Sequence, residues 1–207
     1  MPRRSATDAA RTREAIASAA RAAFAKDGYA GASTARIARD AGVSEGALFH
    51  HFQTKAALFR EVFVALEDEL DAHVRAASRD GAPMDAFLAG CRSAMTFGAR
   101  PDYQRVVLID GPTVLGDAEW RKVDAQIGLA TLTRGLRNLA GRDNLSLAAA
   151  RPLSVLVMGA LNEMIFALAR KEEGVELEAC LEALARMLSP WMDGQGDRSS
   201  TEAGSGA

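Results

Sequence analysis

The stretch STARIARDAGVSEGALFHHF, residues 33–52, decides how the N-terminal part of this chain folds. Ser33 or Thr34 can accept hydrogen bonds from the first free amides of a short helix, and Ser44 can do the same for a second helix over about residues 45–51. The four residues between the two helices include a glycine, as the turn of a helix-turn-helix often does. The pattern therefore predicts this motif.

The apolar and the polar positions of the motif predict different tasks. The apolar positions are expected to lock the two helices together, and they are Ile37, Ala38, Val43 and Leu48. An α-helix fits the major groove of B-DNA, and a preceding helix can brace it across the DNA backbone. The remaining positions are expected to face outward at DNA, and they are Ser44, Glu45, Gly46, Ala47, Phe49 and His50.

His50 and His51 are adjacent, and paired imidazoles suggest metal binding or acid–base chemistry. Neighbouring residues on a helix point about 100° apart, whereas metal-ligand pairs on a helix are spaced i, i+4. The two imidazoles therefore cannot chelate one metal ion together. We expect them to contact DNA phosphates or to be structural, and we expect neither a metal nor another cofactor.

Helix signals dominate the whole chain, and strand signals are nearly absent, so the fold class is predicted to be all-α. Glycines and prolines divide the chain into nine expected helices, with Asp110-Gly111-Pro112 breaking the sixth. The nine helices are expected over about residues 7–26, 34–42, 45–51, 54–78, 83–98, 101–110, 117–139, 148–171 and 175–192. The Gly/Ser-rich residues 193–207 are expected to be a disordered tail.

Charge is distributed unevenly along the chain. Residues 1–60 hold ten Arg or Lys and five Asp or Glu, a net charge of +5, whereas residues 61–207 carry −7. A basic end is a hint of nucleic-acid contact, although short segments also fluctuate in charge. Two distant cysteines, no signal-peptide core and no apolar run of membrane-spanning length predict a cytoplasmic protein that contacts no membrane.

The segment TREAIASAARAAFAKDGYAGASTARIARDAGVSEGALFHHFQTKAALF, residues 12–59, resembles the N-terminal domain of the TetR family of bacterial transcriptional regulators. The resemblance lies in the helix lengths, in Gly-Tyr after the first helix, and in the pattern A-G-V-S-x-G-x-L-[YF]-x-H-F. It implies a helical homodimer in which residues 1–60 bind DNA, with the motif core at 33–52. Residues 61–192 would then bind a ligand and dimerise.

The same resemblance implies roles for individual residues of the DNA-binding part. Thr34 would contact a phosphate, Ser44, Glu45, Gly46 and Ala47 would meet base edges, and Phe49, His50 and His51 would lie against the sugar-phosphate backbone. Lys55 would grip a phosphate beside the positive end of the next helix, and a flexible arm would carry Arg3 and Arg4.

Two positions depart from the family pattern. The family often has lysine or a neutral polar residue at Glu45, where a carboxylate repels phosphate but can accept a hydrogen bond from the exocyclic amine of cytosine. Phe49 replaces the commoner tyrosine and loses one hydroxyl. We therefore expect thin direct base readout, with more recognition through thymine methyl groups and DNA shape.

The second part of the chain is less informative about its ligand. Candidate lining residues are Phe87, Cys91, Met95, Phe97, Tyr103, Trp120, Ile127, Met158, Asn162 and Phe166. Methionine and aromatic side chains suit an adaptable apolar cavity for a small apolar or amphipathic effector, but the same residues at helical spacing also suit a plain core. Asn162 and Glu163 are candidate polar anchors, and either could instead bond across a dimer.

The two C-terminal helices carry enough apolar surface to resemble the dimer interface of the family, an intermolecular four-helix bundle. The candidate interface residues are Leu156, Gly159, Ala160, Glu163, Leu181, Leu184 and Leu188. The alternative that both helices bury these residues within their own subunit stays open.

The combined expectation is a ligand-responsive, homodimeric DNA-binding regulator, a repressor released from a palindromic operator by a small molecule. The alternative is a small-molecule binding protein on the same scaffold whose DNA binding is weak or lost. An enzyme is not expected, because the sequence has no Gly-rich phosphate loop, H-E-x-x-H motif or nucleophile elbow. Neither the effector nor the operator can be read from the sequence.

Overall fold

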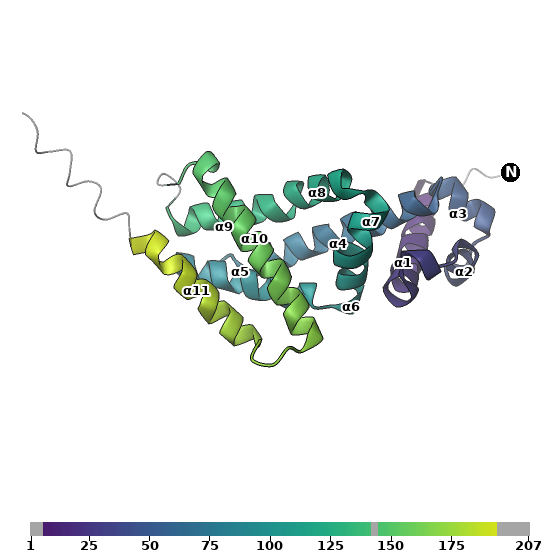
Figure 1. Cartoon of the computed structure of the whole chain (residues 1–207). Coiled ribbons are helices and arrows are strands. Elements are labelled where there is room, and N and C mark those ends of the chain that lie inside the picture. The colour runs from purple at the N-terminus through teal and green to yellow at the C-terminus, as the bar shows by residue number, and fades with distance from the viewer. Residues whose placement is uncertain (1–5, 142–144, 194–207) are drawn as a thin grey trace, which may run out of the picture. The chain divides into compact units, whose positions relative to one another are not determined.

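The computed structural model describes residues 6–141 and 145–193, and the regular elements in these two ranges are all helical (Figure 1). The predicted all-α fold class is confirmed. The expected arm residues Arg3 and Arg4, and the expected tail beyond Asp193, lie outside the described residues.

The chain divides into two compact units that do not follow its order. The first unit comprises the described residues up to Leu70 together with Arg100–Gln126, and the second comprises Asp71–Ala99 and the described residues from Ile127 onward. The sequence analysis placed a boundary at residue 60 between a DNA-binding part and a ligand-binding and dimerisation part, and this functional division stays a prediction.

The first unit contains the predicted motif and the helices that pack behind it. Its elements are α1 (Ala6–Gly31), α2 (Thr34–Asp40), α3 (Glu45–His51), the first part of α4 (Lys55–Ala77), α6 (Pro101–Tyr103), the π-helix η1 (Gln104–Asp110), α7 (Gly111–Leu115) and α8 (Asp117–Gln126). Helix α1 contacts α2, α3, α6 and η1. The fully buried side chains at its core include Ile16, Phe24, Ile37, Leu48, Phe59 and Phe63.

The second unit is built around α5 (Pro83–Gly98), which contacts α9 (Gly128–Leu139), α10 (Leu147–Arg170) and α11 (Leu177–Asp193). Glycines allow two of these contacts. A Cβ on Gly98 would come within 2.6 Å of Ile165 on α10, and a Cβ on Gly135 would come within 3.2 Å of the Phe87 ring. These helices therefore pack closely against α5.

Helix starts follow the predicted caps closely. The side-chain oxygens of Ser33 and Ser44 accept hydrogen bonds from the third residue after each, and Thr54 does the same at the start of α4. Pro83 opens α5, as expected from its fixed φ and missing N–H. Gly28, with a φ of 70°, interrupts the helical backbone near the end of α1, where the sequence placed its end.

Two helix predictions were wrong at their boundaries. The break expected at Asp110-Gly111-Pro112 is absent from this described segment, because the wider turns of η1 lead directly into α7, which continues to Leu115. A wider turn moves the preceding carbonyls away from the Pro112 ring, which would clash in a regular α-helix. The helix expected over 117–139 is instead two helices, separated at Ile127.

One described helix, α10, is long and apolar enough to cross a membrane by length and composition alone. Core helices of globular proteins pass the same test. Only 33% of its most apolar window is buried within the chain, so much of its apolar surface has no partner from the described residues. The sequence analysis found no apolar run of membrane-spanning length, but α10 meets that criterion by length and composition.

Candidate nucleic-acid interface

The turn between α2 and α3 has the geometry that the sequence predicts. Gly42 adopts a φ of 71°, a left-handed conformation that side chains disfavour, and no atom outside its own backbone neighbours lies near its Cβ position. The amide of Val43 donates to the carbonyl of Ala38, which closes the turn. Ile37, Ala38 and Leu48 are buried, whereas Val43 is half-buried.

The outward face of α3 is exposed as expected. Ser44, Glu45, Gly46, Phe49 and His50 are exposed, and Ala47 is half-buried. Phe49 leaves 40% of its surface open, which is unusual for a large apolar side chain. The face therefore has the shape and exposure needed to enter a groove, while its contact with DNA stays a prediction.

The start of α2 is joined to the start of α3 by a side-chain hydrogen bond. The hydroxyl of Thr34 donates to Oε1 of Glu45 across 2.6 Å. The sequence analysis gave these residues separate contacts, one with phosphate and one with a base edge. In the structure they contact each other, and this link could not be predicted because it crosses the turn between residues eleven positions apart.

Lys55 stands at the first position of α4, and its ammonium group lies 4.6 Å from the centroid of the Tyr29 ring. A cation over an aromatic ring is stabilised there without losing its charge. The ring is itself packed edge-on against Phe59, with centroids 5.2 Å apart. Tyr29 therefore positions the predicted phosphate-binding lysine, a role that the Gly-Tyr pattern in the sequence did not reveal.

His50 and His51 lie side by side with ring centroids 5.7 Å apart and planes 71° apart. Among the residues that the structure describes, no group of three or more His, Cys, Asp or Glu side chains could hold a metal ion. His50 is exposed and His51 half-buried. Their expected roles, contact with phosphates or a structural one, stay a prediction.

Arg13 contacts the C-terminal end of α3, a role that the sequence analysis did not predict. Its guanidinium donates to the carbonyl of His51 across 3.0 Å and lies 4.1 Å from the centroid of the Phe52 ring. It also forms a two-pronged ion pair with Glu61 on α4, with the shorter distance 2.7 Å. An arginine in the middle of a helix gives no local signal of such a role.

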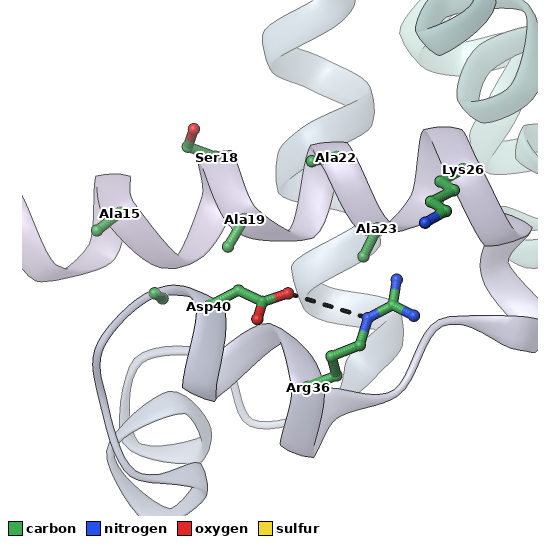
Figure 2. Close-up of a pocket in the computed structure, with 9 residues that line it drawn as sticks. Ala15, Ser18, Ala19, Ala22, Ala23, Lys26, Arg36 and Asp40 are labelled. Carbon is green, nitrogen blue, oxygen red and sulfur yellow. Dashed lines mark ion pairs between the residues drawn. The ribbon is translucent and has the colours of Figure 1, made fainter.

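A hollow of about 700 Å³ lies between α1 and α2 (Figure 2). Its α1 wall is almost all small side chains, and Figure 2 shows Ala19 and Ala23 toward the α2 side, where Arg36 and Asp40 form an ion pair. Arg36 also pairs with Asp27. None of the predicted effector residues lines this hollow.

Charged contacts tie α1 to the segments after residue 100. Asp110 accepts a hydrogen bond from the amide of Tyr29 across 2.6 Å and pairs with Arg105, whose guanidinium lies where a Cβ on Gly28 would be. Only glycine fits at that position, because φ is positive and the space is filled. The end of α1 is thereby fixed next to the Tyr29 ring.

Arg21 bridges two carboxylates, Glu69 on α4 and Asp102 on α6, at 2.5 and 2.8 Å. Burial would raise the pKa of Asp102, but the hydrogen bond from Arg21 and the charges of Arg21 and Arg100 outweigh it, so the pKa lies below its ordinary value. Asp102 therefore remains ionised and holds both arginines.

The ten predicted effector residues are divided between the units. Tyr103 and Trp120 belong to the first unit, and the other eight belong to the second. Tyr103 donates its hydroxyl to the buried carboxylate of Glu67 across 2.8 Å, and the Trp120 indole donates to the carbonyl of Val107 across 3.1 Å. Both polar groups thus have partners within the protein.

The eight residues in the second unit differ in burial. Phe87, Cys91, Met95 and Phe97 on α5 are buried, whereas Ile127, Met158, Asn162 and Phe166 are half-buried. Burial raises the pKa of the Cys91 thiol to about 12, and it also raises the pKa of Cys180, so both thiols are protonated at neutral pH. Their assignment as effector contacts stays a prediction.

The predicted dimer residues fall into two groups. On α10, Leu156, Gly159 and Glu163 are exposed and Ala160 is half-buried. On α11 the burial differs, because the leucine stripe packs into its own subunit, with exposed fractions of 4% for Leu181, 1% for Leu184 and 1% for Leu188. These three side chains have almost no surface left for a partner, so we remove them from the predicted interface.

Two family models match the chain. One is described as tetracyclin repressor-like, C-terminal domain, and matches residues 84–191. The other is described as bacterial regulatory proteins, tetR family, and matches residues 16–62.

Curated relatives match part of the chain. Over 62 residues the chain is 48% identical to the HTH-type transcriptional repressor AcnR of Corynebacterium jeikeium, a match covering 30% of this chain and 33% of that protein. Over 81 residues it is 38% identical to the HTH-type transcriptional repressor Rv1474c of Mycobacterium tuberculosis, covering 39% and 42%. The matches thus span less than half of these relatives.

Solved structures match over most of the chain. A TetR-family transcriptional regulator from Pectobacterium atrosepticum has a TM-score of 0.66 at 27% identity, covering 92% of this chain and 97% of that one. The fatty acid degradation regulator FadR of Bacillus halodurans has a TM-score of 0.69 at 17% identity, covering 85% and 93%. At the lower identity the likeness shows the fold alone.

Proposed function

This chain belongs to the TetR family of bacterial regulatory proteins, and from that premise we propose that it is a homodimeric, ligand-responsive DNA-binding repressor. The observation that carries the proposal is the exposed face of α3, braced by α2 across the Gly42 turn. The repressors that match part of the chain support the same activity. Because the matches cover less than half of these relatives, the sign of regulation is a proposal as well.

The proposed dimer uses the exposed side of α10. Val155 and Leu156 leave 54% and 70% of their surfaces open, and Gly159 is exposed with no atom near its Cβ position. A glycine inside a helix costs about 1 kcal/mol relative to alanine, and it permits another backbone to approach closely. We infer that a second copy of α10 packs on this side, in an isologous contact.

The proposed operator follows from dimer symmetry. Two recognition helices related by a twofold axis reach major grooves about 34–36 Å apart or a multiple of this spacing, so the operator is a rough palindrome. The proposed effector is a small apolar or amphipathic molecule, as the methionine and aromatic side chains of α5 and α10 suggest. It releases DNA only to the extent that it prefers a conformation unable to bind the operator.

Gel-shift titration tests the DNA-binding part of the proposal. The full chain is titrated against DNA from upstream of its own gene and against random duplexes at moderate salt. We expect one upstream fragment to bind at least tenfold more tightly than random DNA, since specific binding commonly exceeds non-specific binding by far more. Equal affinity for every duplex would favour the alternative, a small-molecule binding protein with lost DNA recognition.

A Lys55→Ala variant sharpens this measurement. Because a phosphate contact carries no sequence information, the variant should weaken binding to all duplexes alike and reduce the salt slope by about 1. A change in sequence preference would contradict the assigned role. Lys26→Ala is the matched control, because Lys26 is an exposed lysine lining the hollow between α1 and α2.

Molar mass by light scattering tests the proposed interface. Leu156→Glu places a charge in the apolar contact and should shift the chain from dimer to monomer. Ala118→Glu, at an exposed position on α8, is the control and should leave the dimer intact. A dimer that persists in the first variant would show that the interface lies elsewhere.

A further inference from the structure

The Thr34–Glu45 hydrogen bond places a constraint on how this interface meets DNA, if the proposed function holds. A threonine hydroxyl has one proton and can donate to one acceptor at a time. In the free protein that acceptor is Oε1 of Glu45, 2.6 Å away. Thr34 therefore cannot donate to a phosphate while it donates to Glu45.

A phosphate oxygen that replaces Glu45 at the Thr34 hydroxyl also changes the surroundings of the carboxylate. An oxygen within hydrogen-bond distance of the hydroxyl would lie within a few ångströms of the carboxylate, and the two negative charges would repel each other. The Glu45 side chain is exposed, so it can rotate away. An ionised carboxylate is only an acceptor, so it needs a new donor once DNA covers it.

The side chains that follow Glu45 on α3 offer it no donor, and the arginines of α2 have acidic partners of their own. Gly46 and Ala47, the next residues of α3, carry no polar side-chain group. Arg36 already pairs with Asp27 and Asp40, and Arg39 lies 3.7 Å from the same Asp40. A base edge in the major groove can supply the donor instead.

The base edges differ in what they offer a carboxylate. Cytosine presents the N4 amine as a donor, whereas guanine and thymine present acceptors on their own edges. Adenine has a donor amine, but its N7 acceptor lies beside it and faces the second carboxylate oxygen. Cytosine is therefore the base that best replaces the Thr34 hydroxyl as the partner of Glu45.

We propose that Glu45 is a specificity-determining residue that acts by exchanging hydrogen-bond partners. On a cognate site, the Glu45 carboxylate accepts a hydrogen bond from a cytosine amine instead of from Thr34. The Thr34 hydroxyl then donates to a phosphate. On a site without that cytosine, the Thr34 hydroxyl continues to donate to Glu45, and its contact with the phosphate is not made. Base recognition and backbone contact are thus coupled through one proton. A glutamate that only read the base would leave Thr34 independent of it.

The test begins with selection of duplexes from a random pool by the full-length wild-type protein. The recovered duplexes should share a cytosine at symmetry-related positions, and replacing its pair by T·A should weaken wild-type binding by about tenfold or more. Selection by Glu45→Ala should lose this preference. Glu14→Ala is the matched control, because it removes an exposed carboxylate from α1 and should keep the preference.

A double-mutant cycle on two duplexes distinguishes exchange from simple reading. Affinities of wild type, Thr34→Val, Glu45→Ala and the double variant are measured on the selected duplex and on its T·A version. In the wild-type background, Thr34→Val should weaken binding severalfold on the first duplex and little on the second. In the Glu45→Ala background, it should weaken both equally, because no carboxylate competes for the hydroxyl.

The outcomes separate this inference from the function on which it rests. If Thr34→Val weakens wild-type binding equally on both duplexes, exchange is wrong although the protein binds DNA specifically. If Glu45→Ala selects the same cytosine as wild type, Glu45 does not read it. If wild type enriches no sequence at all, the proposed function itself fails, and the inference with it.

Discussion

The two units of the molecule rely on different contacts between their elements. In the first unit, charged side chains join separate helices, as Arg13 does with Glu61 and Arg21 does with Glu69 and Asp102. In the second, the Arg92–Glu178 ion pair also joins α5 to α11, but glycines bring helices against apolar side chains, with Gly98 against Ile165 and Gly135 against Phe87. Charge contacts weaken with salt, whereas packing responds to volume. In the unit proposed to bind DNA, salt therefore weakens both the ion pairs between helices and the proposed contacts with DNA phosphates.

The largest expected effect tests packing in the second unit. Met95 on α5 is fully buried, so Met95→Ala should lower the free energy of unfolding by about 3 kcal/mol through lost burial and an unfilled cavity. Denaturant titration at low and high salt should give the same loss. Thr96→Ala, at the exposed neighbouring position, is the control. A loss that changes with salt would contradict the comparison.

A smaller effect is expected from the buried polar pair of the first unit. Tyr103→Phe removes the hydroxyl that donates to the carboxylate of Glu67, which is 1% exposed. Leaving a buried acceptor without its hydrogen bond costs about 2 kcal/mol, so unfolding should become easier by that amount. Tyr29→Phe keeps its ring contacts with Phe59 and Lys55 and serves as control. Equal losses in the two variants would contradict the assignment.

The smallest effect has a pH dependence. Asp102→Asn weakens the contacts of Arg21 and Arg100 and should cost about 1 kcal/mol at neutral pH. Because the folded-state pKa is lowered, the contribution of Asp102 is present above its ordinary pKa near 4 and is lost as the pH falls through the folded-state value. The difference from wild type should therefore shrink below about pH 4.

Thermal unfolding across this pH range measures that difference. Asp68→Asn, an exposed carboxylate on α4, is the control and should show little difference at any pH. A difference between wild type and Asp102→Asn that grows on acidification would mean that the sign of the pKa shift is wrong.

The helix-turn-helix could be predicted almost residue by residue because its signals are local. Ser44 caps α3 and Gly42 makes the turn, so the expected bounds at Glu45 and His51 are confirmed. The link between Thr34 and Glu45 could not be predicted, since it depends on the angle between two helices rather than on either helix alone. Local signals thus gave the elements of the site but not their contacts.

The second half of the chain was harder to predict because an apolar stripe does not say what it packs against. Leu181, Leu184 and Leu188 have the spacing of an interface and of a core alike, and the structure buries them in their own subunit. Likewise, Gly111 and Pro112 read as a helix break, yet the backbone continues through a π-helix. Tertiary packing decided the first case, and a change of helix type decided the second.

The π-helix η1 sets the angular register of α7, which follows it directly. A π turn closes between residues five apart, the spacing that joins Arg105 to Asp110, and so it holds one residue more than an α turn. Deleting one residue inside η1 would let the segment close as an α-helix and would rotate later side chains by about 100° relative to earlier ones. Asp110 would then turn away from the Tyr29 amide. The extra residue therefore keeps Asp110 in reach of the Tyr29 amide at the end of α1, and so helps to hold the Tyr29 ring that lies next to Lys55.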